Sequence, residues 1–298
     1  MKQVNPKIIA TISIGVALML LYTIDIIFFD ILFKSDNVAL FFVVIISSVI
    51  LMSSVYWAED GKEIFIREIP GIKAMEEAVG RATEMGKPVL FVPGILDFNE
   101  VETIAGINVL GHVSSLTADY ETELNVPVSK SIVMEAAREM CKESYLQAGR
   151  PDLYNNDMVY FLADSQFAYA AGINGYMLRE KPAACFYQGK FYAESLLLAE
   201  TGNSIGAIQI AGTGSSSQIP FFVTACDYTL IGEEFLTASA ILSDKPDLKG
   251  SIRGQDIIKL LAIIGMVMVA FLPLVPLVIK YVMVSGIKFL FIFLMGVS

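Results

Sequence analysis

Apolar residues are concentrated at the two ends of the chain. Nearly continuous apolar runs cover Ile8–Phe29, Val38–Trp57 and Ile257–Ser298. A helix rises about 1.5 Å per residue, so roughly 20 residues cross a hydrocarbon core of about 30 Å. The first two runs therefore predict a transmembrane hairpin. The third run is interrupted by two prolines near its middle, which predicts one membrane helix and a second apolar helix over 277–297.

Between these ends, the pattern alternates between helical and strand periodicity. Amphipathic segments predict helices, and short apolar runs predict strands at 88–93, 124–128, 159–163, 183–187, 207–211 and 228–231. Continuously apolar strands are typical of a parallel sheet that is covered on both faces. The pattern thus predicts an α/β fold with a mostly parallel, Rossmann-like sheet. We divide the chain into an N-terminal transmembrane hairpin (1–57), an α/β domain (58–256) and a C-terminal membrane segment of one or two helices (257–298).

Charge separates the same regions. The whole chain is 55% hydrophobic and 17% charged, with a formal net charge of −10. Residues 58–256 contain 28 Asp or Glu and 15 Lys or Arg, so the acidic surplus lies in this middle domain. An acidic surface repels nucleic acid, and we expect no nucleic-acid partner. The expected partners are the lipid bilayer and further copies of the chain.

Positive residues flank the apolar runs on one side. Lys2 and Lys7 precede the first run, and Lys62 and Arg67 follow the second, whereas the short hairpin loop holds only Lys34. The positive-inside rule predicts a multi-pass protein of the cell membrane, with the N-terminus and the middle domain in the cytoplasm. The three cysteines of the middle domain fit a reducing compartment.

The segment A-G-T-G-S-S-S-Q at 211–218 is the best candidate for a binding site. It follows a predicted strand and precedes a predicted helix, so its glycines and free backbone N–H groups suit an anion. An acidic pair about 20 residues further on lies near the position of the ribose-binding acid in dinucleotide folds. Against this, a serine replaces the third glycine of that motif, and Pro220 lies in the first turns of the helix. The candidate residues are Gly212, Thr213, Gly214, Ser215, Ser216 and Glu233.

Other chemistry finds little support in the sequence. The motif G-x-S-x-G of serine hydrolases is absent, and the only histidine, His112, lies within a predicted helix. One histidine and three scattered cysteines do not match the ligand sets of zinc or iron sites. The acidic residues near 97–102 and 119–123 are more typical of a helix N-terminus and a solvated turn. We therefore predict no catalytic residues, no metal site and no cofactor.

Small residues indicate surfaces where helices pack closely. Ser47 and Ser54 share one face of the second membrane run, and small residues recur along the helix predicted at 165–179. Lys288 stands in the middle of the last apolar run, where a charge needs a partner or an interfacial position. The candidate residues for oligomer or helix packing are Ser47, Ser54, Ala168, Gly172, Gly175 and Lys288.

Three stretches of the middle region form a recognisable set. They are E-I-P-G-I-K-A-M-E-E-A-V-G-R-A-T-E-M-G-K-P-V-L-F-V-P-G at 68–94, the stretch from E-K-P-A-A-C-F to I-Q-I-A-G-T at 180–213, and C-D-Y-T-L-I-G-E-E at 226–234. Together they resemble an uncharacterised prokaryotic membrane-protein family with a domain of unknown function. The resemblance implies a membrane protein and supplies no activity or catalytic residues.

These observations favour a structural or scaffolding protein, in which membrane helices anchor an α/β domain that assembles with copies of itself. The alternative is a nucleotide- or phosphate-binding domain, possibly an enzyme, with its site at Gly212–Gln218. A third, weaker interpretation is a transport component that uses Asp25 and Lys288 within the membrane.

Overall fold

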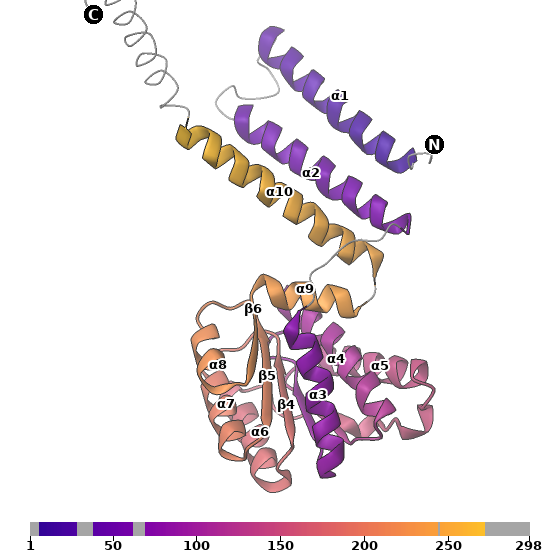
Figure 1. Ribbon diagram of the computed structural model, residues 1–298, viewed down its shortest axis with the longest axis vertical. Coiled ribbons are helices and arrows are strands. Elements are labelled where there is room, and N and C mark those ends of the chain that lie inside the picture. The colour runs from indigo at the N-terminus through magenta and orange to yellow at the C-terminus, as the bar shows by residue number, and fades with distance from the viewer. Residues whose placement is uncertain (1–5, 29–37, 62–68, 244, 272–298) are drawn as a thin grey trace, which may run out of the picture. The chain divides into compact units, whose positions relative to one another are not determined.

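The described residues form two compact units (Figure 1). A computed structural model describes residues 6–28, 38–61, 69–243 and 245–271. One unit contains Met1–Ile64 and Gly250–Ser298, and the other contains Phe65–Lys249. We call the second unit the α/β domain.

Three long helices belong wholly or mostly to the first unit. They are α1 (Pro6–Phe28), α2 (Val38–Glu59) and α10 (Pro246–Phe271). Within the described residues, one helix is both long and apolar enough to cross a membrane, and its apolar stretch is Phe42–Glu59. The expectation of several flanking transmembrane helices is not supported by these residues. The second apolar helix expected over 277–297 lies outside them.

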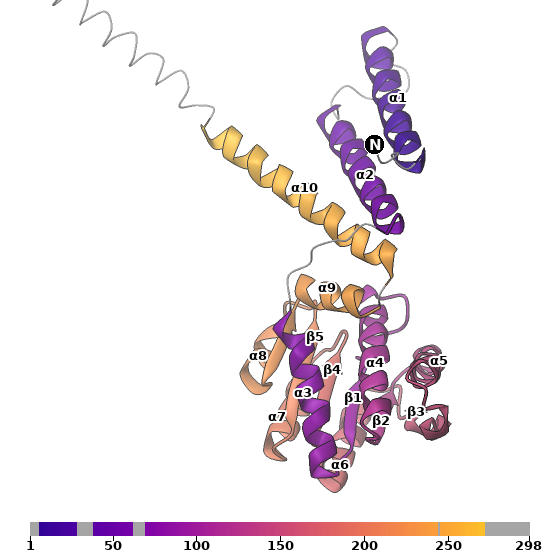
Figure 2. The ribbon, with the colours of Figure 1, turned by 45° about the vertical axis from the view of Figure 1, so that its right-hand side comes forward.

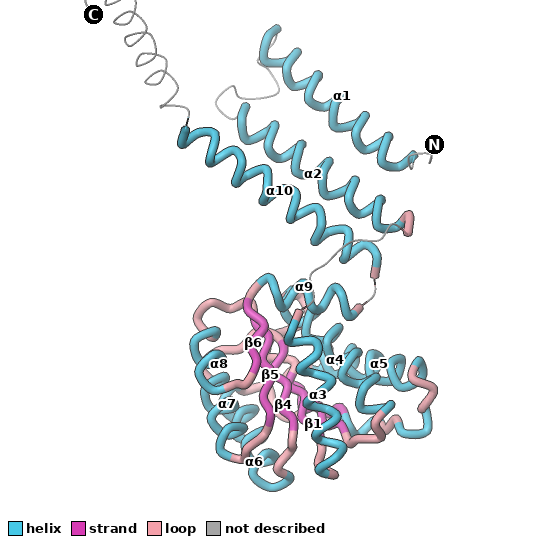
Figure 3. Tube along the Cα trace, viewed as in Figure 1, coloured by secondary structure: helices cyan, strands magenta, loops and turns pink. Residues whose placement is uncertain are grey.

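The α/β domain alternates strands with helices, as Figure 3 shows. Its strands are β1 (Val89–Val92), β2 (Leu124–Val128), β3 (Val159–Phe161), β4 (Ala184–Gln188), β5 (Ile208–Thr213) and β6 (Tyr228–Ile231). Its helices are α3 (Pro70–Met85), α4 (Val101–Asp119), α5 (Ser131–Gln147), α6 (Gln166–Glu180), α7 (Glu194–Ser204), α8 (Ile219–Ala225) and α9 (Glu233–Leu242), with short 3-10 turns at Pro151–Leu153 and Asn156–Met158.

The six strands form one parallel sheet in the order β3-β2-β1-β4-β5-β6. The prediction of an α/β fold with a parallel sheet is confirmed. The chain builds outward from β1 to β3 and then crosses to β4, so the order reverses between β1 and β4. In open parallel sheets, ligands bind at such a reversal, beyond the carboxyl ends of the strands.

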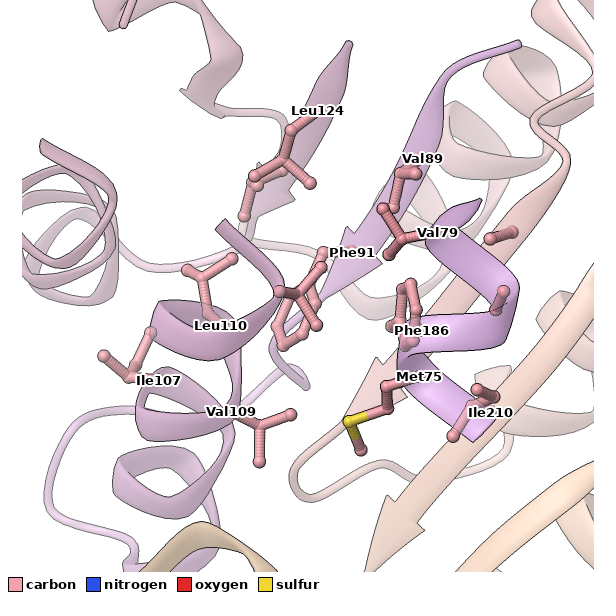
Figure 4. Close-up of a cluster of buried hydrophobic side chains, with 14 of the residues drawn as sticks. Met75, Val79, Val89, Phe91, Ile107, Val109, Leu110, Leu124, Phe186 and Ile210 are labelled. Carbon is pink, nitrogen blue, oxygen red and sulfur yellow. The ribbon is translucent and has the colours of Figure 1, made fainter. Parts of the chain in front are cut away.

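Each face of the sheet has its own hydrophobic core. Successive strand residues point to opposite faces, so Phe91 and Phe186 face one core while Leu90 and Tyr187 face the other. The first core packs against α3, α4, α5 and α9, and Figure 4 shows Met75 of α3 within this cluster. The second core packs against α6, α7 and α8. Figure 2 shows α3 and α4 on the same side of the sheet, the side of the first core.

Candidate functional site

The turns after β1 and β4 are in direct contact at the point where the strand order reverses. The backbone N–H of Ile95 donates a hydrogen bond of 3.0 Å to the carbonyl of Lys190. Gly94 and Gly189 have φ of +79° and +141°, and a Cβ on Gly94 would lie 2.7 Å from the Lys190 carbonyl oxygen. Only glycine permits this conformation and this approach together. The protein's own backbone therefore fills the space between these two turns.

Helix α4 closes the same region over the end of β4. A Cβ on Gly106 would lie 2.4 Å from the carbonyl oxygen of Gln188, the last residue of β4. The absence of a side chain thus lets the first half of α4 rest on the end of the strand. Because α4 covers the end of β4 at Gly106, a ligand at this edge of the sheet has to bind further out, over the turns that follow β4 and β5.

Charged and hydroxyl side chains lie at that position. The carboxylate of Glu102 on α4 accepts a hydrogen bond of 3.3 Å from the Thr213 hydroxyl, and it also accepts one from the backbone N–H of Gly214. The ammonium of Lys190 lies 3.3 Å from the carboxylate of Glu100. The turn after β5 therefore already holds an anionic group, which α4 supplies.

Burial governs the protonation of this carboxylate. Desolvation raises the pKa of Glu102 above its ordinary value of 4.5, and the hydrogen bond from Gly214 and the charge of Lys190 oppose that rise. The backbone N–H of Ser215 donates to the Thr213 hydroxyl at 3.2 Å, which keeps the turn in place. The Glu102 carboxylate is thus held partly out of water by a fixed set of donors.

The structure distributes the predicted residues of this segment between strand and turn. Gly212 and Thr213 belong to β5, and Ser216 lies in the turn that precedes the short helix α8. Glu233 begins α9 directly after β6. Because Thr213 pairs with Ile231 across the sheet, Glu233 lies at the same edge as the turn. The pairing of β5 with β6 therefore brings together residues that are about 20 positions apart in the sequence.

Buried polar residues surround this edge, and the sequence pattern did not mark them as candidates. The Gln188 amide donates 2.9 Å to the carbonyl of Ile210, and its oxygen has no hydrogen-bond partner among the described residues. The fully buried Glu194 accepts from the backbone N–H of Tyr192 and from the Gln166 amide, at 2.8 and 2.6 Å. Gln188 could have been noticed as a polar residue that ends an apolar strand pattern, whereas Glu194, the first residue of α7, had no such signal.

The predicted packing serines lie on α2. Ser54 is buried, and a Cβ on Gly250 of α10 would lie 2.8 Å from its carbonyl oxygen. A Cβ on Gly254 would lie 2.9 Å from the side chain of Leu51. The region around Ser54 therefore packs against α10 of the same chain. The hydroxyl of Ser47 donates to the carbonyl of Val43, one helical turn earlier.

The predicted small residues of α6 have different surroundings. Gly172 packs within the domain, since a Cβ there would lie 2.7 Å from the side chain of Leu162. Ala168 is exposed, and a Cβ on Gly175 would meet only the Arg179 guanidinium, at 3.4 Å. Lys288 lies outside the described residues, as does the side chain of Asp25.

One side of α6 presents apolar and small residues to solvent. Phe167 and Leu178 are 65% and 58% exposed, and Ala171 between them is also exposed. These positions recur at helical spacing and share one side of the helix. We define the α6 face as Phe167, Ala168, Ala171, Gly175 and Leu178.

The other groups considered for chemistry are the single histidine and the residue types that bind metals. Burial lowers the pKa of His112, and its Nε2 has no hydrogen-bond partner within the described part of the chain. No three His, Cys, Asp or Glu side chains among the described residues lie together as a metal site requires.

Fold and site define an α/β protein with a doubly wound parallel sheet whose strand-end turn is occupied by its own glutamate. The chain belongs to the family described as "Domain of unknown function (DUF6754)", which matches residues 30–283. The expected resemblance to a family with a domain of unknown function is confirmed. No curated protein and no solved structure matches the chain significantly.

Proposed function

We propose that the protein is a membrane-anchored scaffold whose α/β domains assemble with one another through the α6 face. The observation that carries this proposal is the exposure of Phe167 and Leu178 on one side of a helix. Large apolar side chains that share one exposed face are typical of contact surfaces. The occupant we infer is a second copy of the chain.

Charge supports a contact between copies. The α/β region carries a large acidic surplus, so two domains repel each other over most of their surfaces. The α6 face contains no charged residue, and the only charged residues of the helix are Arg179 and Glu180 at its end. Ala168, Ala171 and Gly175 are small enough for a second helix to approach closely. The guanidinium of Arg179 borders this face beside Gly175, and no acidic residue belongs to the face. The α6 face is therefore a contact area without negative charge on an acidic domain.

The energy of this contact is modest. Burying the exposed fractions of two Phe167 and two Leu178 side chains yields roughly 4–7 kcal/mol, at about 1.5–3 kcal/mol for each fully buried side chain. Association costs about 4–15 kcal/mol in lost freedom. Assembly through this face therefore depends on a raised local concentration, which anchoring in one membrane provides.

The anchoring itself is part of the proposal. The apolar stretch of α2 is the primary anchor, and we include α1, α10 and the C-terminal apolar segment as further membrane helices. The lysine and arginine flanks support placing the α/β domain on the cytoplasmic side of the cell membrane.

The test is chemical cross-linking of the full chain in its membrane, followed by the mass of the cross-linked products, because the raised local concentration on which the contact depends exists only there. Wild-type protein is expected to form dimers or larger assemblies, and Leu178→Asp is expected to reduce them. Leu146→Asp is the matched control, because Leu146 is 64% exposed near the end of α5 and Leu178 is 58% exposed near the end of α6. A monodisperse wild-type monomer, or equal loss of assembly in both variants, would overturn the proposal.

A second candidate function is binding of a nucleotide or phosphate at Gly212–Gln218. Its support is that Thr213 and Gly214 already donate to the carboxylate of Glu102, so the turn accepts an anion. An incoming phosphate would compete with that carboxylate. We expect thermal stabilisation by ATP, NAD or inorganic phosphate, larger in Glu102→Gln and absent in Gly214→Val. If none of these ligands stabilises Glu102→Gln, this candidate is refuted.

A further inference from the structure

Helices α2 and α10 lie side by side and pack closely where the apolar stretch of α2 ends (Figure 1). A Cβ on Gly250 would lie 2.6 Å from the Cα of Val55, and a Cβ on Gly254 would lie 3.1 Å from the Cα of Leu51. These glycines are about one helical turn apart, so the backbone of α10 approaches that of α2 directly. The side chain of Arg253, which lies between them in the sequence, is therefore held close to α2.

Arg253 contacts the ring of the single tryptophan. Its guanidinium carbon lies 3.0 Å from the centroid of Trp57, which is a cation–π contact. Within the described ranges, Arg253 forms no ion pair and its side chain donates no hydrogen bond. A guanidinium has five N–H donors and stays charged at any pH that a protein tolerates. This half-buried group therefore has a charge and a set of donors that the described part of the chain does not satisfy.

The neighbouring carboxylates are engaged with other cations. Glu59, two residues after Trp57, pairs with Lys7 at 3.3 Å. Asp256, three residues after Arg253, pairs with Lys259 at 3.8 Å. Neither carboxylate compensates the guanidinium, so an anion from outside the chain is needed to do so.

Trp57 and Arg253 mark the same boundary of the apolar segments. Trp57 lies near the end of the apolar stretch of α2, and Arg253 lies four residues, or about 6 Å, before the apolar run that begins at Ile257. Tryptophan is enriched at the level of the lipid headgroups, and an arginine near the end of a membrane helix extends to the same level. The proposed anchoring, on which this inference rests, therefore places the guanidinium of Arg253 among lipid phosphates.

We propose that Arg253 and Trp57 form a binding site for the headgroup phosphate of an anionic phospholipid such as phosphatidylglycerol. The planar guanidinium donates two parallel hydrogen bonds to phosphate oxygens, and the face of the Trp57 ring holds it in position. A zwitterionic headgroup such as that of phosphatidylcholine carries its own positive charge, which offsets the phosphate. The site therefore selects lipids with a net negative charge.

The fluorescence of Trp57 reports on this site, because the chain contains no other tryptophan. The full chain is reconstituted into mixed vesicles of phosphatidylcholine and phosphatidylglycerol, and either lipid is brominated in the upper part of its acyl chains to quench a nearby tryptophan. The ratio of the two quenching efficiencies measures which lipid is enriched beside Trp57, and it is insensitive to changes in emission that a substitution causes. We expect an enrichment of phosphatidylglycerol of about fivefold in wild type and none in Arg253→Gln.

Lys259→Gln is the matched control, because it removes one positive charge from the same helix at a residue that pairs with Asp256. A preference that is lost in Arg253→Gln and kept in Lys259→Gln supports the site. Equal quenching by the two lipids in wild type, an unchanged preference in Arg253→Gln, or equal loss in both variants overturns the site and leaves the anchoring intact.

Two further outcomes separate this site from the anchoring and from a soluble ligand. If neither brominated lipid quenches Trp57 in wild type, both the site and the anchoring are overturned. Inorganic phosphate offers the same oxygens as a headgroup. If it removes the preference while sodium chloride of equal ionic strength does not, the site binds a dissolved anion and the lipid proposal is overturned.

Discussion

Helix α4 approaches the backbone of the sheet closely at Gly106, and replacing this residue tests how the strand-end region is built. In Gly106→Ala, the new Cβ would lie 2.4 Å from the carbonyl oxygen of Gln188. Carbon and oxygen atoms in close contact normally lie about 3.3 Å apart, so α4 and β4 have to separate by roughly 0.9 Å. Both partners are backbone, and neither can move away by changing rotamer.

The magnitude follows from comparison with Gly80→Ala. Gly80 lies within α3, and a Cβ there has no other atom within 4 Å. Both substitutions gain about 1 kcal/mol of helix propensity. Overpacking costs about 1–3 kcal/mol and applies only to Gly106. Gly106→Ala is therefore expected to be about 1–3 kcal/mol less stable than Gly80→Ala.

The assay is thermal unfolding of both full-length variants in the same detergent, followed by near-ultraviolet circular dichroism of the buried tyrosines. One kcal/mol corresponds to about 2–4 °C in a domain of this size, so we expect the Tm of Gly106→Ala to lie roughly 2–12 °C below that of Gly80→Ala. Equal Tm values, or a higher Tm for Gly106→Ala, would refute the contact between α4 and the end of β4.

Three further substitutions test other parts of the structure. Burial raises the pKa of Glu102, so the folded state holds this proton more tightly than the unfolded state, and wild-type stability falls as pH rises from 4.5 through the raised pKa. Glu102→Gln should lack this fall, so in denaturant titrations its free energy of unfolding should rise relative to that of wild type as pH increases. A difference between the two proteins that stays constant with pH contradicts the raised pKa. Phe186→Ala should lower the free energy of unfolding by about 3–5 kcal/mol, because this ring is fully buried, and a loss below 1 kcal/mol would contradict that packing. Arg253 of α10 lies over the ring of Trp57, the single tryptophan, so Gly250→Leu, which should separate α10 from α2, should shift the fluorescence of Trp57. Gly265→Leu should leave the fluorescence unchanged, because a Cβ at Gly265 has no neighbour within 4 Å.

The secondary structure of the α/β domain was largely predictable, because apolar runs and breaks in periodicity mark each strand and helix. The strands 124–128 and 228–231 have the predicted bounds. Helix α8 begins at Ile219, three residues later than the start near Ser216 that the pattern predicts. Pro220 explains the difference: proline has no backbone N–H and fits the first turn of a helix, so the preceding serine-rich residues remain in a turn.

The geometry of the candidate site was less predictable, because it depends on contacts between distant segments. The glycines of 211–218 suggested an anion-binding turn, but the group that occupies it comes from Glu102, 111 positions away from Thr213. Periodicity places Glu102 at the start of a helix and contains no information about which strand that helix meets. Similarly, the sequence offered Gly172 for oligomer or helix packing without distinguishing the two, and the position packs on Leu162 of the same domain.

The central claim, self-association through the α6 face, is tested most directly by cysteine cross-linking at Ala171. This residue is exposed between Phe167 and Leu178, and a cysteine there would face its counterpart in a second copy. In membranes that contain Ala171→Cys with Cys226→Ser, mild oxidation is expected to yield a disulfide-linked dimer. The control is Glu200→Cys, which is exposed on α7, in the same background. A dimer at Ala171→Cys alone agrees with self-association through this face, and equal or absent cross-linking at the two positions contradicts it.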